Sequence, residues 1–133
     1  MERLGLVFKR FALGAFGLLW FLFAACQEEE IQRIDYNALK ELQTKNQSKL
    51  VFLDVRTEDE FQRGHVDAAI NVPLNELAKR IAELDKDWLI VIYCRSGNRS
   101  KKAYQILKES GFKKIYDFGG IADWPEPLQI GKP

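Results

Sequence analysis

Cys94 is the residue with the clearest capacity for covalent chemistry in this chain of 133 residues. It follows the apolar run Leu89-Ile90-Val91-Ile92-Tyr93 and precedes the polar run Arg95-Ser96-Gly97-Asn98-Arg99-Ser100. A buried structural cysteine would be followed by more apolar residues or by an ordinary turn, whereas this cysteine begins a polar and cationic bend. The position therefore predicts a chemical role for the sulfur.

The bend after Cys94 is suited to stabilising negative charge. A thiolate is the reactive form of cysteine, and the unpaired N–H groups and the dipole of a helix N-terminus favour it. Gly97 and Asn98 tolerate positive φ, so the backbone is expected to curl until several N–H groups point inward. Ser100 is expected to cap the helix that follows. The bend is thus predicted to bind an anion through Arg95, Ser96, Gly97, Asn98 and Arg99.

The hydrophobic pattern around this bend predicts alternating strands and helices. The expected strands are the β-rich runs at 50–55, 69–72, 89–93 and 115–118. The expected helices lie at about 36–45, between Thr57 and Gly64, from Leu74 to Leu84, and from the bend to Gly111. This order is typical of an α/β fold with a parallel sheet covered by helices on both faces. Ligands of such sheets bind at the carboxyl ends of strands, where Cys94 lies.

The N-terminal segment has the pattern of a secretory signal. Three basic residues precede an uncharged apolar stretch at 11–25, which is short for a bilayer span of about 20 residues. The stretch ends Phe23-Ala24-Ala25-Cys26, which resembles the lipobox of bacterial lipoproteins and implies lipid on Cys26. The alternative is an uncleaved signal anchor. The expected organisation is a signal peptide at 1–25, a lipidated tether at 26–33 and a domain at 34–133, exported and held at a membrane facing the periplasm or the cell surface.

Charge and cysteine content limit the partners of this domain. Removal of residues 1–25 leaves 17 basic and 18 acidic residues, a net charge of −1. A nucleic-acid partner is not expected, because it would require a clustered basic excess. With lipid on Cys26, Cys94 becomes the single free thiol of the domain, so no internal disulfide can form.

Four sequence segments resemble the rhodanese family of sulfurtransferases. They are Leu53-Asp54-Val55-Arg56, Phe61 to Pro73 with the run Gly64-His65-Val66, Tyr93 to Ser100, and Gly119-Gly120 with Trp124 four residues on. The resemblance implies that Cys94 takes a sulfur from a small donor such as thiosulfate as a persulfide and passes it to a thiol or other thiophilic acceptor. Arg95 would attract the anionic donor. The resemblance implies no metal or organic cofactor, and a monomer is expected.

Charged residues near the bend are expected to support it. Arg99 could bind the donor or pair with Asp54, and the pair with Asp54 is favoured. Arg56 and Glu60 form the second expected pair. His65 is the single histidine of the chain, and the resemblance implies a structural role for it, not that of a general base.

Two other classes of function remain as alternatives. Phosphatases of this fold and related arsenate reductases place five residues between the cysteine and the arginine, whereas four separate Cys94 from Arg99. The shorter loop favours a single sulfur atom over a tetrahedral oxyanion. The stronger rival is a non-catalytic or redox-sensing binding module, in which an accessible Cys94 is oxidised to a sulfenic acid.

Overall fold

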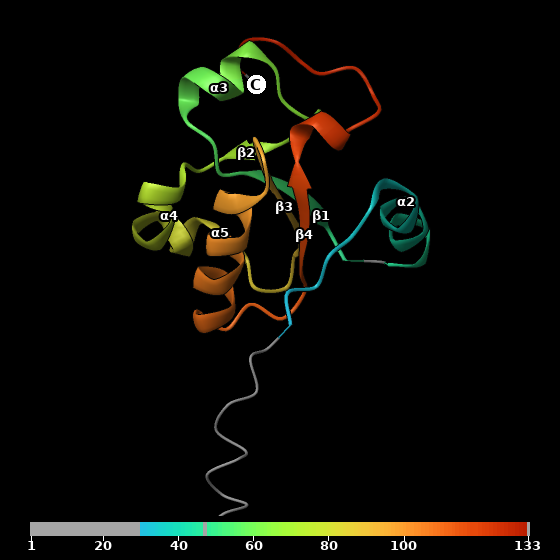
Figure 1. Ribbon diagram of the computed structural model, residues 1–133. Coiled ribbons are helices and arrows are strands. Elements are labelled where there is room, and N and C mark those ends of the chain that lie inside the picture. The colour runs from blue at the N-terminus through green and yellow to red at the C-terminus, as the bar shows by residue number, and fades with distance from the viewer. Residues whose placement is uncertain (1–29, 47, 133) are drawn as a thin grey trace, which may run out of the picture. The chain divides into compact units, whose positions relative to one another are not determined.

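The computed structural model describes residues 30–46 and 48–132, and its strands and helices alternate as expected (Figure 1). The strands are β1 (Leu50–Asp54), β2 (Ile70–Asn71), β3 (Leu89–Cys94) and β4 (Ile115–Gly120). The helices are α2 (Tyr36–Lys45), α3 (Glu58–Arg63), α4 (Leu74–Arg80) and α5 (Asn98–Glu109), with 3₁₀ turns η1 (Ile81–Glu83) and η2 (Ile121–Asp123). The residues from Ile31 onward form one compact unit.

The four strands form one parallel sheet in the order β2-β1-β3-β4. β3 is an inner strand, and all six of its residues are buried. Its register places Tyr93 beside Asp54 of β1 and Cys94 beside Gly120 of β4. The predicted parallel sheet is therefore confirmed, and Cys94 lies at the carboxyl end of an inner strand.

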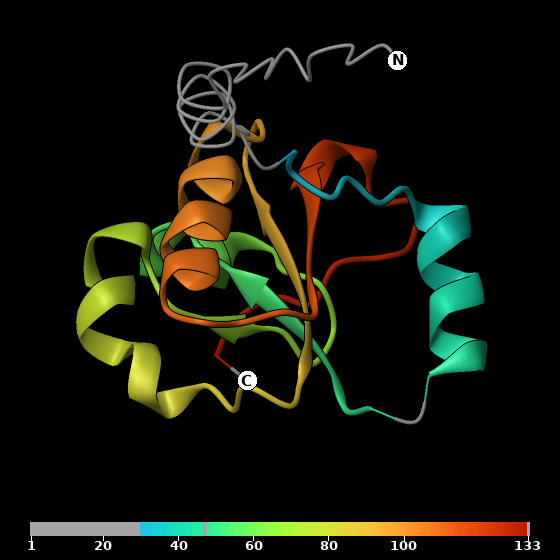
Figure 2. The same cartoon turned by 90° about the horizontal axis from the view of Figure 1, so that it is seen from below.

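Helices cover both faces of the sheet (Figure 2). One face packs with α4 and α5 around residues that include Ile92, Cys94 and Leu107. The other packs with α2 around residues that include Leu39, Val91 and Tyr93. Successive side chains of a strand point to opposite faces. The side chain of Cys94 therefore lies on the α5 face, and that of Tyr93 on the α2 face.

Local signals set the ends of the short helix α3. The Thr57 side chain accepts the Glu60 N–H, and the Glu60 side chain accepts the Thr57 N–H, which makes a complete capping box. Gly64 ends the helix, as expected. Six residues are too few for a helix to be stable alone. α3 therefore depends on this box and on the burial of Phe61.

The predicted signal segment at 1–25 and the predicted lipidation site Cys26 lie outside the described residues. Within the part of the chain that is described, no helix has the length and apolar character needed to cross a bilayer. The lipoprotein interpretation therefore stays a prediction.

Candidate active site

Cys94 lies between the end of β3 and the first turn of α5, with a bend at 95–97 joining them. The residue is 1% exposed, because its side chain packs with the core on the α5 face. The expected accessible setting of Cys94 is therefore wrong. The sequence shows the polar loop but not how closely the loop covers the sulfur.

Gly97 supplies the described hydrogen bond to the cysteine sulfur. Its N–H donates to Cys94 Sγ over 3.0 Å, and its φ of +95° is a conformation that glycine adopts without strain. Gly97 also caps α5, which carries no acidic residue in its first turn. The sulfur therefore faces a backbone donor and the positive end of a helix dipole.

The expected cap of α5 at Ser100 is wrong. Ser100 does not cap α5, because it lies inside the first turn, where its Oγ donates to the Gly97 carbonyl over 3.0 Å. Asn98 begins the helix with ordinary backbone geometry, and among the described residues Ala68 is the one non-glycine with positive φ. Gly97 alone makes the left-handed turn, so the helix starts earlier than expected.

The glycine pair at the end of β4 lets the loop approach the sheet. A β-carbon at Gly120 would lie 3.0 Å from the carbonyl oxygen of Arg95, and one at Gly97 would lie 3.6 Å from the Cα of Gly119. A bulge in β4 at Phe118 brings these glycines into register with Tyr93 and Cys94. The expected strand ended at residue 118, so this role of Gly119-Gly120 was missed. Two adjacent glycines at the end of a strand were the available signal.

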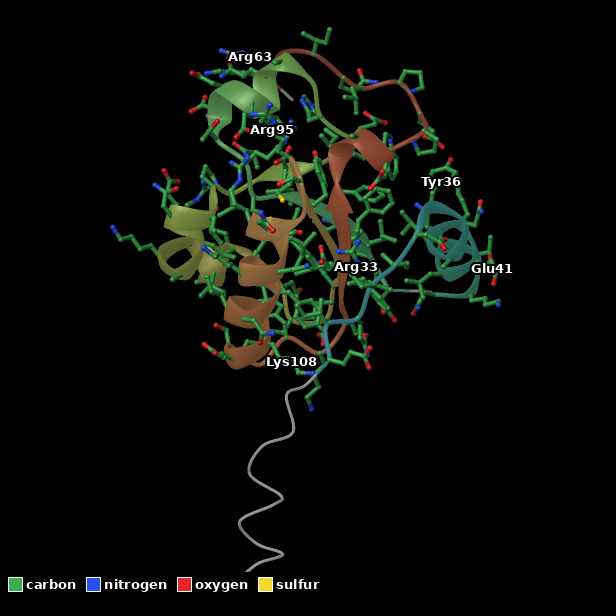
Figure 3. The ribbon with its side chains drawn as sticks, in the orientation of Figure 1. Arg33, Tyr36, Glu41, Arg63, Arg95 and Lys108 are labelled. Atoms are coloured by element: carbon green, nitrogen blue, oxygen red, sulfur yellow. The ribbon has the colours of Figure 1, made fainter. Side chains whose placement is uncertain are left out.

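The remaining predicted substrate-binding residues differ in exposure. Arg95, Ser96 and Asn98 are exposed, while Arg99 is partly buried. Figure 3 shows Arg95 at the end of the sheet where α3 lies. An exposed cation at this position is suited to meeting an anion that arrives from solvent.

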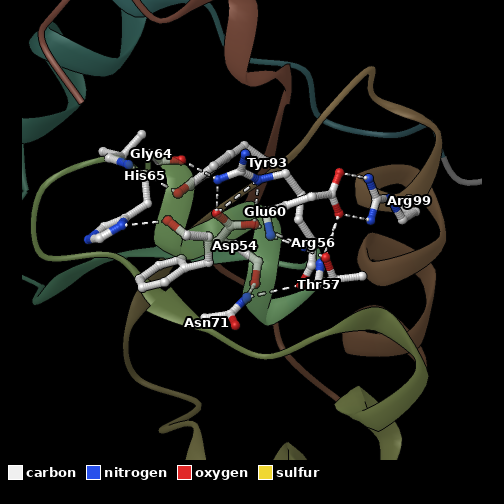
Figure 4. A network of polar contacts seen from close by, with 11 residues as sticks. Asp54, Arg56, Thr57, Glu60, Gly64, His65, Asn71, Tyr93 and Arg99 are labelled. Atoms are coloured by element: carbon white, nitrogen blue, oxygen red, sulfur yellow. Dashed lines mark hydrogen bonds and ion pairs between the residues drawn. The ribbon is translucent and has the colours of Figure 1, made fainter. Parts of the chain in front are cut away.

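The ion pair nearest the end of β1 joins Asp54 to Arg56, and not to Arg99 (Figure 4). Arg56 Nη2 donates to Asp54 Oδ2 over 2.6 Å and to the Gly64 carbonyl over 2.7 Å, and Arg56 Nε also donates to the carboxylate. Asp54 is fully buried, and the guanidinium carbon lies 5.6 Å from the centre of the Tyr93 ring. This pair ties β1 to the end of α3.

Arg99 pairs with Glu60 instead, through two parallel hydrogen bonds of 2.7 and 2.8 Å. The pair joins the first turn of α5 to α3 (Figure 4). The hydrogen bond to Glu60 raises the pKa of Arg99, and the charges of Glu60, Cys94 and Asp54 add to this effect. Arg99 therefore supports the loop through Glu60 while it remains within electrostatic reach of Cys94.

The two predicted pairings were exchanged, and strand alternation explains why. Asp54 is in register with Tyr93 and shares its face, whereas Cys94 and α5 lie on the opposite face. Arg56, two residues after Asp54, returns to the same side as the carboxylate. Arg99 on α5 instead meets α3, whose first turn carries Glu60.

Lowering the pH should remove the contribution of the Glu60–Arg99 pair to the stability of the fold. The hydrogen bond from Arg99 lowers the pKa of Glu60 from its ordinary value of 4.5 to about 2. A carboxylate whose pKa is lower in the folded than in the unfolded state stabilises the fold fully at pH values above its unfolded-state pKa. This stabilisation is lost as the pH falls through its folded-state pKa. Urea unfolding of wild type and Glu60→Gln should therefore show a stability difference at pH 6 that shrinks between pH 4.5 and 2. A difference that stays constant over this range would contradict the assignment.

His65 has the structural role expected for it. Its Nδ1 lies 2.9 Å from the Phe61 carbonyl, and its ring stacks on that of Phe61 with centroids 3.7 Å apart. Its backbone also pairs with Gln129 near the C-terminus. His65 therefore fixes the end of α3 against the C-terminal segment.

Comparisons with known proteins agree with this geometry. The family model described as rhodanese-like domain matches residues 35–126. The thiosulfate sulfurtransferase PspE of Escherichia coli (strain K12) is 38% identical over 82 residues, which are 60% of this chain and 79% of PspE. A solved structure described as rhodanese with anions from E. coli is 37% identical with a TM-score of 0.58, covering 62% of this chain and 99% of that chain.

Some relatives are much longer than the matched segment. The putative sulfur carrier protein YrkF of Bacillus subtilis (strain 168) is 37% identical over 95 residues, which are 71% of this chain and 51% of YrkF. A probable molybdopterin-synthase adenylyltransferase of Porphyra purpurea is 35% identical over 96 residues, which are 71% of this chain and 25% of that protein. The chain thus spans a quarter to a half of these two proteins. The family model matches most of the chain, and the Cys94 loop lies at the carboxyl end of a parallel sheet. The chain therefore belongs to the rhodanese-like domain family.

Proposed function

We propose that this chain is a sulfurtransferase in which Cys94 carries a sulfane sulfur from an anionic donor such as thiosulfate to a thiophilic acceptor. The observation that carries the proposal is the 3.0 Å hydrogen bond from the Gly97 N–H to Cys94 Sγ at the N-terminus of α5. A backbone donor and a helix dipole favour an anionic sulfur at this point. The named relative PspE supports thiosulfate as the donor to test first.

The chemistry has two displacement steps. The Cys94 thiolate attacks the outer sulfur of thiosulfate, a sulfur–sulfur bond to Cys94 forms, and the bond to sulfite breaks with its electron pair leaving on sulfite. An acceptor thiolate then attacks the outer sulfur of the persulfide, and the electron pair of the breaking bond returns to Cys94 as thiolate. The steps balance without an external oxidant, a metal or an organic cofactor.

Mass measurement of the intact protein tests this proposal. After incubation with thiosulfate, wild type should gain one sulfur atom, and dithiothreitol should remove it. Two added oxygens have the same nominal mass as one sulfur, but a sulfinic acid resists dithiothreitol. A reversible gain supports sulfur transfer. A gain that persists after reduction, or no gain, supports the redox or non-catalytic alternative.

Arg95→Ala should weaken the use of thiosulfate mainly through KM. The side chain is exposed beside Cys94, so its charge attracts the donor before chemistry begins. KM should rise by about fivefold with little change in kcat. Added salt should reduce the difference in KM between wild type and the variant, because it screens the attraction. Steady-state kinetics at low and high salt would check this. An increase in KM that salt does not reduce would contradict the electrostatic role.

The location of the protein is proposed from its N-terminal sequence. Lipid on Cys26 would hold the domain at a membrane outside the cytoplasm, since two acyl chains give stable anchoring without a spanning helix. Labelled fatty acid should enter the wild-type chain but not Cys26→Ser. Equal labelling of the two chains, or no labelling of either, would contradict lipidation at this residue.

A further inference from the structure

Arg33 pairs with Asp117 of β4, the strand beside the Cys94 loop, although Arg33 lies two residues before the segment that matches the family. The backbone of 32–34 runs beside β4, where Ile34 N–H donates to the Asp117 carbonyl and Asp117 N–H donates to the Gln32 carbonyl. Arg33 itself is bridged to Asp117 in parallel register. This segment was expected to be part of a tether, but its backbone is joined to the sheet.

The side chain of Arg33, which is 54% exposed, pairs with a buried carboxylate. Its Nη1 lies 3.1 Å from Asp117 Oδ2, and the Asp117 side chain is fully buried. The other carboxylate oxygen, Oδ1, accepts the N–H of Gly119 over 3.0 Å. Asp117 is in register with Ile92, so its side chain points to the same face of the sheet as Cys94. Arg33 and Asp117 together hold the bulge that precedes Gly119.

The guanidinium group also occupies the space in which a side chain at Gly119 would stand, and Gly97 lies next to Gly119. A β-carbon at Gly119 would lie 2.9 Å from Arg33 Nη2 and 3.4 Å from Arg33 Cζ. A β-carbon at Gly97 would lie 3.6 Å from Gly119 Cα and 4.0 Å from Arg33 Nη1. Arg33, Gly119 and Gly97 are therefore close neighbours. Figure 3 shows Arg33 beside β4.

We propose that Arg33 is a positioning residue for the candidate active site, acting through Asp117 and Gly119 to hold the Gly97 N–H on Cys94 Sγ. Gly97 has no side chain to fix its conformation, so its orientation depends on the surfaces that it touches. Arg33 and Gly119 provide one of these surfaces, and the Ser100 hydroxyl holds the Gly97 carbonyl from the other side. The effect on sulfur transfer rests on the function proposed above, whereas the effect on the Gly97 hydrogen bond does not.

Amide hydrogen exchange of the full-length chain, ¹⁵N-labelled and kept in mild detergent, tests the proposal. In Arg33→Ala, protection of the Gly97 amide should fall by about tenfold relative to that of Val91 in the core of β3. A loss of general stability would instead lower both amides together. Arg80→Ala is the matched control, because it removes an arginine that pairs with Glu76 and Glu83 on the surface of α4. It should leave the ratio of Gly97 to Val91 protection unchanged.

Kinetics give a second readout. Arg33→Ala should lower kcat for thiosulfate by about fivefold with KM within about twofold of wild type, since the donor-binding surface is intact. If Arg33→Ala does not fold, Arg33→Lys replaces it, because lysine keeps a charge near Asp117 but offers no flat group to Gly119. The same selective loss is expected in that variant.

The outcomes separate this proposal from the proposed function. A selective loss of Gly97 protection supports the positioning role, even if wild type transfers no sulfur, in which case the proposed function alone fails. Gly97 protection that is unchanged, or that falls in parallel with Val91, overturns the positioning role. An unchanged kcat in an active enzyme overturns it as well.

Discussion

Cys94→Ser should lose all measurable thiosulfate turnover while it keeps its fold. The serine hydroxyl is close in size to the thiol and can accept the Gly97 N–H that now bonds to the sulfur. Its oxygen is a poor nucleophile at neutral pH without an adjacent base, and it cannot form a persulfide. Turnover with a thiol acceptor, the melting curve and the intact mass after thiosulfate treatment would be measured together. No turnover, a melting curve close to that of wild type and no added sulfur are the expected results.

Cys26→Ser is the matched control for this experiment. Cys26 is the other cysteine of the chain, and it lies outside the segment that matches the family. Purified Cys26→Ser should gain one sulfur from thiosulfate as wild type does. Turnover that survives in Cys94→Ser, or sulfur loading that disappears in Cys26→Ser, would show that the transferring thiol has been assigned wrongly.

Arg56→Ala should produce the largest loss of stability among the arginine variants. It leaves the carboxylate of Asp54 fully buried with no cation, and it also removes the hydrogen bond to the Gly64 carbonyl. Breaking one partner of a buried ion pair costs on the order of 3 to 5 kcal/mol. A domain of this size is stabilised by only about 5 to 15 kcal/mol, so this loss is a large share of the total.

Arg99→Ala supplies the comparison for Arg56→Ala. The side chains of Arg99 and Glu60 are 32% and 25% exposed, so water replaces part of the lost interaction. The expected loss is about 1 kcal/mol. Urea unfolding at pH 7 of both variants, with Arg80→Ala as a control for the loss of a similarly exposed arginine on α4, would measure the difference. Equal losses for Arg56→Ala and Arg99→Ala, or a larger loss for Arg99→Ala, would contradict the structural assignment of the two pairs.

Local sequence signals determined the elements of this fold and the place of Cys94 in it. The range of α2 and the capping box and end of α3 follow from residues within a few positions of each other. The residues that form such a capping box lie three positions apart, so the pattern is visible in the sequence, although α3 also needs the burial of Phe61 to be stable. The alternation of strands and helices likewise required a parallel sheet, and it placed Cys94 at the carboxyl end of a strand.

Tertiary structure decided which groups meet around that sulfur. The partners of Arg56 and Arg99 depend on the register of β1 and β3, since one step along a strand moves a side chain to the other face. The burial of Cys94 and the contact of Arg33 with Gly119 depend on how the loop, β4 and the segment before α2 pack together. Asp117 and Arg33 are 84 residues apart, and no local pattern marks either as the partner of the other. Such contacts arise only when the sheet assembles, because strand order and register bring distant residues together.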